Sequence, residues 1–304
     1  MIFTSFKALK GDAFLISVGV NNILVDGGTP NTYGQIASAI DESLLNAVFI
    51  THVDYDHIGG IINLINDFNF NLSDCAFYMN HPDLAVEYQG DEVGYKHGDS
   101  LQSILKKRNK EFSSLKSKDE IHIGEIVVSV LSPQVNILND LHNNWNASKV
   151  FQDSGMSYSQ RQINNGDIIN KSSVVLLVTY GSRKILLLGD SHADTVCKVL
   201  KENAYSEVNP LCVELLKLSH HGSRHNTNDK MLKLIRCEKF YVSTNGASYG
   251  HPDSETIYLL QKRAAELNTV FTVYLNYDIE VEIRDKCSFE LKNLEFKQEN
   301  RLDI

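Results

Sequence analysis

Short apolar runs that end in polar or glycine residues recur along the chain. They have the length and the β-branched content of buried strands, and they stop at residues that favour turns. The runs are ISVGVNNILVDGG at 16–28, NAVFITH at 46–52, EIVVSVLSP at 125–133, SVVLLVTYGSRKILLLGD at 173–190, CVELLKLSHHG at 212–222 and KFYVSTNG at 239–246. The pattern therefore predicts strands over most of the chain.

Helical segments are predicted between these strands. They are IGGIINLINDF at 58–68, SHADTVCKVLKENA at 191–204 and SETIYLLQKRAAEL at 254–267, where Asp253 or Ser254 can cap the helix. Because strands and helices alternate without a Pro-rich or Gly/Ser-rich linker, we expect an α/β fold with a single domain over residues 1–304. Residues 91–167 differ, since they are rich in Asn, Ser, Gln and Lys, and we expect a partly irregular insertion there.

Composition narrows the class of protein. With 42% apolar residues, the 304-residue chain can bury a substantial core. The net charge is -9 and no Lys/Arg-rich run occurs, which argues against a broad electrostatic grip on nucleic acid. The five cysteines form no CxxC pair, and neither a basic leader nor a run of roughly 18 apolar residues occurs. We therefore expect a cytoplasmic protein that does not bind a membrane.

The stretch THVDYDHIGG at 51–60 concentrates ligand chemistry in one turn. Its candidates are His52, Asp54, Asp56 and His57. They follow a predicted buried strand, at the carboxyl end where open sheets place ligands, so we expect a loop that leads into a helix beginning at His57. Imidazole and carboxylate together suit zinc, manganese or iron. Gly59 and Gly60 would let that helix pack closely on the sheet. A solvated acidic turn is the alternative.

Two further polar clusters end apolar runs. Asp190 follows ILLLG, and His220 and His221 follow LLKLS. Alone, Asp190 would be interpreted as a helix cap. Together, the three clusters indicate a centre of two divalent ions, manganese or zinc, in which the Asp190 carboxylate can bridge ions about 3.5–4 Å apart.

In this order, THVDYDHIGG, LLLGD and SHHGS resemble the signature of the metallo-β-lactamase superfamily. The resemblance is closest to the soluble hydrolase domain of the competence protein ComEC and its free-standing relatives. Further motifs support it over roughly residues 2–290: KGDAFLI, ILVDGG, VLSPQ, NKSSVVL and NGASYGHP. The resemblance implies a four-layer αβ/βα sandwich and cleavage of phosphodiesters, most of all DNA, by metal-activated water.

The resemblance also implies roles for single residues. The metal ligands would be His52, Asp54, Asp56, His57, Asp190 and His220. Asp26 and His221 would not bind the metal themselves but would position its ligands through hydrogen bonds. Asp56 would also orient the attacking water, and His251 would donate a proton to the leaving oxygen or contact the phosphate. Ser173, Ser223 and Asn245 would contact the substrate.

The sequence departs from the family pattern at two positions. Asp54 stands where most members have a second His, which is the ComEC-like form. The usual third-motif His is missing, because that stretch is NKSSVVL with Ser172 and Ser173. The histidines that could replace it are His81, His122 and His142. The alternatives to a nuclease are a small-molecule phosphodiesterase, a lactonase, and a non-catalytic metal-binding partner in a larger complex, such as a defence or competence-type system.

Overall fold

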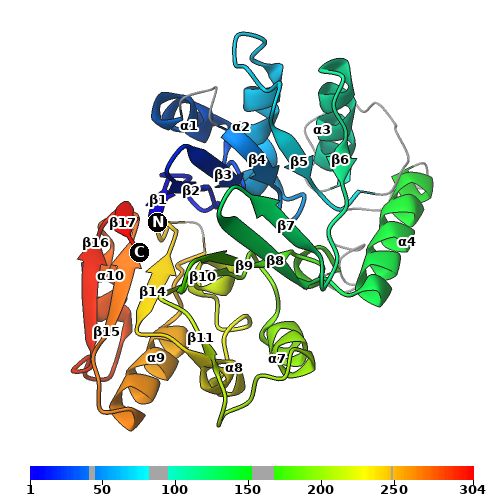
Figure 1. The fold of residues 1–304 in the computed structure, drawn as a ribbon. Helices are drawn as coiled ribbons and strands as arrows, with labels where there is room; N and C mark the ends of the chain where they lie inside the picture. Colours follow the sequence, from blue (N-terminus) through cyan, green and yellow to red (C-terminus); the bar gives the residue numbers. More distant parts are fainter. Residues whose placement is uncertain (41–44, 82–94, 153–167, 248) are drawn as a thin grey trace.

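The computed structural model describes residues 1–40, 45–81, 95–152, 168–247 and 249–304. Two β-sheets pack face to face, and helices cover the outer face of each sheet (Figure 1). This arrangement confirms the α/β fold class and the four-layer αβ/βα sandwich that the sequence predicts. The chain ends meet in the first sheet, where β1 (Ile2–Ser5) pairs antiparallel with β17 (Arg301–Asp303).

In the described part of the chain, the first sheet has the strand order β17-β1-β2-β3-β4-β5-β6. Its other strands are β2 (Phe14–Val18), β3 (Asn21–Val25), β4 (Leu45–Phe49), β5 (Ala76–Tyr78) and β6 (Phe112–Ser113). From β3 to β6 the strands run parallel, so their carboxyl ends lie at one edge. The residues that follow β4 therefore emerge at this edge.

The second sheet has the order β16-β15-β14-β12-β10-β9-β8-β7 over the described residues. Its strands are β7 (Glu120–Ile123), β8 (Ile126–Ser132), β9 (Val175–Tyr180), β10 (Arg183–Leu187), β12 (Leu215–Lys217), β14 (Lys239–Val242), β15 (Phe271–Leu275) and β16 (Leu294–Gln298). A short parallel pair, β11 (Leu211–Cys212) and β13 (Ile235–Arg236), lies outside both sheets. Because β10, β12 and β14 are parallel neighbours, Asp190 and the His220–His221 pair leave the sheet at the same edge.

The helices divide between the two outer layers. Against the first sheet lie η1 (Pro30–Thr32), α1 (Tyr33–Ala39), α2 (Tyr55–Asn66), α3 (Tyr95–Lys107), α4 (Val135–Gln152) and α6 (Ile168–Lys171). Against the second lie α7 (Ala193–Glu202), α8 (Asp229–Leu234), α9 (Ser254–Glu266) and α10 (Glu280–Lys286). None of the described helices is long and apolar enough to cross a membrane.

Three apolar clusters hold the layers together. The central cluster consists of strand residues from both sheets, such as Phe3, Phe49 and Tyr241, whose side chains are fully buried. The outer clusters join each sheet to its helices, with Trp145 of α4 buried on one side and Leu260 of α9 on the other. Burial of apolar surface is the main stabilising term in folding, so these clusters fix the edge at which the polar residues meet.

Gly60 explains how closely α2 approaches the first sheet. A Cβ atom at this position would lie 2.1 Å from the carbonyl oxygen of Gly27, and the Gly60 amide donates to the Gly28 carbonyl at 3.1 Å. Only glycine tolerates so close a backbone contact. The sequence predicted this packing, but α2 begins at Tyr55 rather than at His57, so Asp56 and His57 lie in its first turn.

The region from 91 to 167 contains more regular structure than its composition suggested. Its described part holds α3, β6, β7, β8 and α4. Residues 91–94 and 153–167 lie outside the described residues.

Candidate metal centre

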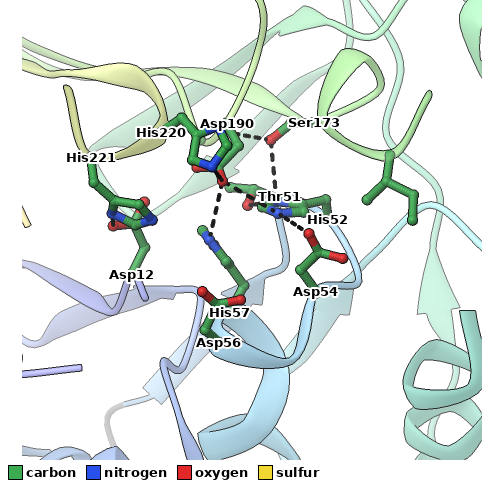
Figure 2. Close-up of polar contacts among 12 residues, drawn as sticks. Asp12, Thr51, His52, Asp54, Asp56, His57, Ser173, Asp190, His220 and His221 are labelled. Carbon is green, nitrogen blue, oxygen red and sulfur yellow. Dashed lines mark hydrogen bonds and ion pairs between the residues drawn. The ribbon is translucent and has the colours of Figure 1, made fainter. Parts of the chain in front are cut away.

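The candidate metal ligands converge at the shared edge of the two sheets, although they come from distant parts of the sequence (Figure 2). His52 and Asp54 follow β4, Asp190 follows β10, and His220 and His221 lie in the short 3-10 segment η3 (Ser219–Gly222) after β12. The strand ends place all of them around one point.

Asp190 lies at the centre of the cluster. Its Oδ2 atom is 3.7 Å from the Nε2 atoms of His52, His57 and His220. These separations exceed a hydrogen bond, which needs about 2.7–3.2 Å for N–H···O contacts. One carboxylate oxygen thus faces three imidazole nitrogens across gaps too wide for direct bonding.

The hydrogen bonds behind the rings fix which nitrogen carries the proton. The Asp26 carboxylate lies 2.8 Å from His57 Nδ1, so that nitrogen donates, and in the neutral ring that a metal would bind Nε2 keeps its lone pair. Thr51 Oγ1 donates to Asp26 at 2.6 Å and can therefore accept from His52 Nδ1 at 3.0 Å. His221 Nδ1 lies 2.7 Å from the Ser243 carbonyl, which can only accept. All three rings therefore direct Nε2 lone pairs away from these partners, as ligands to a metal do.

Buried polar atoms near this point have no hydrogen-bond partner among the described residues. They are the Nε2 atoms of His52 and His57 and the Oδ1 atoms of Asp54 and Asp190. Leaving such atoms unpaired is costly in a buried site. A divalent cation would satisfy lone pairs of nitrogen and oxygen together, so these residues fit the metal centre that the sequence predicts.

The charges of the cluster also favour a cation. Burial alone would lower the pKa of His57, but the carboxylates of Asp190 and Asp26 raise it well above its ordinary value. Burial alone would raise the pKa of Asp190, but the surrounding histidines hold it well below its usual range. Positive charge between these groups is therefore stabilised.

Among the described residues, three overlapping sets of possible ligands have atoms within 4.8 Å of one another. The first is His52, His57 and Asp190, the second is Asp56, His57 and His221, and the third is Asp12, Asp26 and His57. His221 is buried, whereas 31% of the His220 side chain is exposed. The sequence predicted that His220 binds the metal and that His221 only supports the ligands. In the structure, His220 faces Asp190 and His221 lies close to Asp56.

The histidine pair has a strained backbone conformation that neighbouring contacts maintain. His220 and His221 have φ angles of 47° and 56°, in the left-handed region that costs non-glycine residues energy. The His220 amide donates to the Gly189 carbonyl at 3.1 Å, which ties η3 to the residue before Asp190. The turn therefore positions both imidazoles relative to Asp190.

A buried ion pair lies beneath His221. Lys217 of β12 contacts the Asp12 carboxylate, and both side chains are almost completely inaccessible to water. Ser243 donates to Asp12, whose Oδ1 is also 3.4 Å from His221 Nδ1. Burial alone would raise the pKa of Asp12, but Lys217 and His221 hold it below its usual range. The pair joins the loop after β1 to the second sheet directly under the candidate site.

Lys217→Met should lower the free energy of unfolding by about 3–5 kcal/mol, because it leaves the buried Asp12 charge without its partner. Urea denaturation of the metal-free protein measures this change. Lys239→Met is the control, since Lys239 is exposed on the neighbouring strand β14. The double change Asp12→Asn with Lys217→Met should recover most of the loss. A single Lys217→Met variant as stable as the parent would contradict this account.

The remaining predicted residues occupy different places. Ser173 Oγ accepts from the Asp190 amide at 3.0 Å and lies 3.4 Å from His52 Nδ1, so it adjoins the cluster. The His251 ring lies 5.7 Å from the His220 ring. Ser223 Oγ accepts from the His225 amide, and Asn245 Oδ1 accepts from the Ala247 amide, so both stabilise nearby turns.

The three histidines considered as replacements for the missing family ligand are spread apart. His81 packs against Trp145 at a ring distance of 4.7 Å, and exposed His122 pairs with Glu120. His142 lies on α4. None of the three belongs to a ligand cluster found among the described residues. Ser173, from the stretch in which the resemblance implies that ligand, lies beside His52 and Asp190.

Comparison with known proteins supports the fold, and part of the sequence is similar to the metallo-β-lactamase superfamily. The model of the metallo-β-lactamase superfamily matches residues 7–83. The metallo-β-lactamase fold protein YhfI from Bacillus subtilis is 14% identical, with 99% of this chain and 98% of that one covered and a TM-score of 0.51. Zn²⁺-bound PqqB from Methylobacterium extorquens is 10% identical, with both chains fully covered at 100% and a TM-score of 0.50. No curated protein sequence matches the chain.

Proposed function

We propose that the protein is a metal-dependent hydrolase that cleaves phosphodiesters, with DNA as its substrate. The observation that carries the proposal is the Asp190 oxygen that faces three imidazole nitrogens at 3.7 Å. Carboxylate and imidazole from separate strand ends form the type of ligand set used in two-metal hydrolytic sites. The ComEC-like form of the His52–His57 motif supports a phosphodiester substrate.

The residues divide the chemistry between them. When bound, divalent ions lower the pKa of water toward neutrality and polarise a phosphoryl oxygen. Asp56 is partly exposed in the first turn of α2 and can hold and orient a water molecule. Burial lowers the pKa of His251 although Asp253 raises it, so the ring is mainly neutral at pH 7. Such a ring can take a proton from water and return it to the leaving oxygen.

The net charge of -9 limits how the protein could bind DNA. A protein of this charge cannot hold a long polyanion by general attraction, so binding must depend on the ions and on a few local cations. Association with a partner protein in a defence or competence-type system is part of the same proposal, because such a partner would supply further contacts to DNA.

The test measures turnover of an aryl phosphodiester and nicking of supercoiled plasmid. Both are measured with protein that a chelator has freed of metal, and again after metal is restored. Metal-dependent turnover of both substrates supports a nuclease. Turnover of the aryl ester alone would favour a small-molecule phosphodiesterase. Complete inactivity of a folded, metal-loaded protein would contradict the proposal and leave a metal-binding partner as the better description.

Manganese should support a higher rate than zinc, because Asp54, Asp56 and Asp190 make the cluster rich in carboxylates and harder ions prefer oxygen ligands. The measurement is kcat for the aryl phosphodiester after titration of the metal-free protein with each ion. Equal metal content in the two samples is the control. A rate with zinc equal to or above that with manganese would overturn this expectation.

A further inference from the structure

A chain of side-chain contacts runs from Asp56 to His220 beside the cluster of candidate metal ligands. Lys10 Nζ lies 4.0 Å from Asp56 Oδ2 and 5.3 Å from the ring centre of Tyr249. The Tyr249 ring stacks on His251 with 6.0 Å between centres and an interplanar angle of 26°. His251 in turn lies 5.7 Å from His220. Lys10 and Tyr249 thus stand between two residues of the proposed catalytic centre.

Lys10 and Tyr249 belong to two different loops, and a backbone hydrogen bond joins these loops. Lys10 lies in the loop between β1 and β2, and Tyr249 lies between β14 and α9. The Asn245 amide donates to the Leu9 carbonyl at 2.8 Å, and the Leu9 amide donates to the Tyr277 hydroxyl at 2.9 Å. The first bond joins the two loops next to Lys10, and the second ties Leu9 to the segment after β15, so the loop that carries Lys10 is held close to the loop that carries Tyr249.

Both side chains remain available to a ligand. Tyr249 is 67% exposed, which leaves most of the ring open to a stacking partner. Lys10 is 41% exposed and pairs with Asp56 only at the distance limit of an ion pair. Exposed pairs of this kind contribute little to stability, so Lys10 can exchange Asp56 for an incoming anion at little cost.

We propose that Lys10 and Tyr249 form the substrate-recognition site for a phosphodiester that carries a nucleobase beside the scissile phosphate. The Lys10 ammonium binds a phosphate oxygen, and the Tyr249 ring stacks on the base. A compact ammonium suits a single phosphate, and an aromatic ring stacks on any base without reading its sequence. This inference rests on the proposed function, because it names the class of phosphodiester that the same centre cleaves.

Two substrates with one leaving group separate the two contacts. The first is the 4-nitrophenyl ester of thymidine 5′-monophosphate, and the second is methyl 4-nitrophenyl phosphate, which has the same charge and no base. Tyr249→Ser should lower kcat/KM roughly 5–100-fold for the thymidine ester and leave the methyl ester unchanged, because only the first can stack. Lys10→Met should raise KM about 10–100-fold for both esters, because both carry the phosphate charge.

Matched variants control for indirect effects. Lys7→Met removes another lysine of the same loop, and the Lys7 Nζ atom lies 5.4 Å from the ring centre of Tyr277. This variant should leave kcat/KM unchanged for both esters. Tyr249→Phe keeps the ring and should retain the preference for the thymidine ester. Metal content should stay at the parental value in every variant. Loss of metal in Lys10→Met would mean that Lys10 acts by positioning Asp56, and the recognition role would be wrong.

The other outcomes are equally decisive. If Tyr249→Ser slows both esters equally, the ring only props His251, and the recognition site is wrong. If the parent protein hydrolyses neither ester, the proposed function is wrong. The same variants are then compared by the dissociation constants of the two esters, measured by calorimetry with the metal-loaded protein. Tighter parental binding of the thymidine ester that disappears in Tyr249→Ser would still support the site, and equal binding of both esters would reject it.

Discussion

Asp190→Asn should lower phosphodiester turnover by several orders of magnitude and should deplete the protein of metal. Its Oδ2 atom lies 3.7 Å from the Nε2 atoms of three histidines, and its charge raises the pKa of His57, which burial alone would lower. An amide of nearly the same volume removes that charge while it leaves the packing intact. Metal and electrostatic effects supply most of the rate in such centres, so the loss should be large.

Three measurements decide this prediction: metal content by emission spectrometry, turnover of the aryl phosphodiester, and circular dichroism as a check of folding. Asp194→Asn is the matched control, because Asp194 is exposed in the first turn of α7, only four residues from Asp190. It should keep parental metal content and rate. A folded Asp190→Asn protein that retains both ions and the parental rate would show that the centre has been assigned wrongly.

The sequence predicted the parts of the site that local pattern can encode. Each of the motifs around His52, Asp190 and His220 follows an apolar run, and each run became a strand of one of the two sheets. Because parallel strands end at a shared edge, the alternation of strands and helices was enough to expect convergence of these ligands. The three predicted helices also formed, as α2, α7 and α9.

Contacts between distant segments could not be predicted in this way. Lys217 and Asp12 are 205 positions apart, and nothing in their spacing indicates that they meet. One signal was present, since Lys217 is a single charge inside the apolar run LLKLS, and a buried lysine needs a carboxylate partner. The contact of Lys10 with Tyr249 likewise depends on how two loops pack.

The 91–167 region shows a second limit of sequence patterns. Many Asn and Ser residues lowered the expectation of helix, yet α4 forms and buries Leu141 and Trp145 against the first sheet. Tertiary packing overrode the weak helical propensity of these residues. Strands β15 and β16 were also not predicted, and they extend the second sheet beyond β14.

His221→Ala should lower turnover by more than the roughly 10–100-fold typical of residues that only support a ligand. His221 is buried, donates from Nδ1 to the Ser243 carbonyl, and belongs to the set with Asp56 and His57. That combination is the usual arrangement of a histidine that binds metal through Nε2. His220→Ala should cause a loss of similar size, because His220 Nε2 faces Asp190.

The two histidine variants should differ in which ion they lose. His220→Ala removes a nitrogen beside Asp190 and His52, whereas His221→Ala removes one beside Asp56, so each should release about one ion while the other stays bound. His225→Ala is the control, since His225 is exposed four residues further along and should change neither metal content nor rate. If His221→Ala keeps both ions and loses only about 10–100-fold in rate, His221 has the supporting role that the sequence suggested, and the ligand set must be completed by His220 alone.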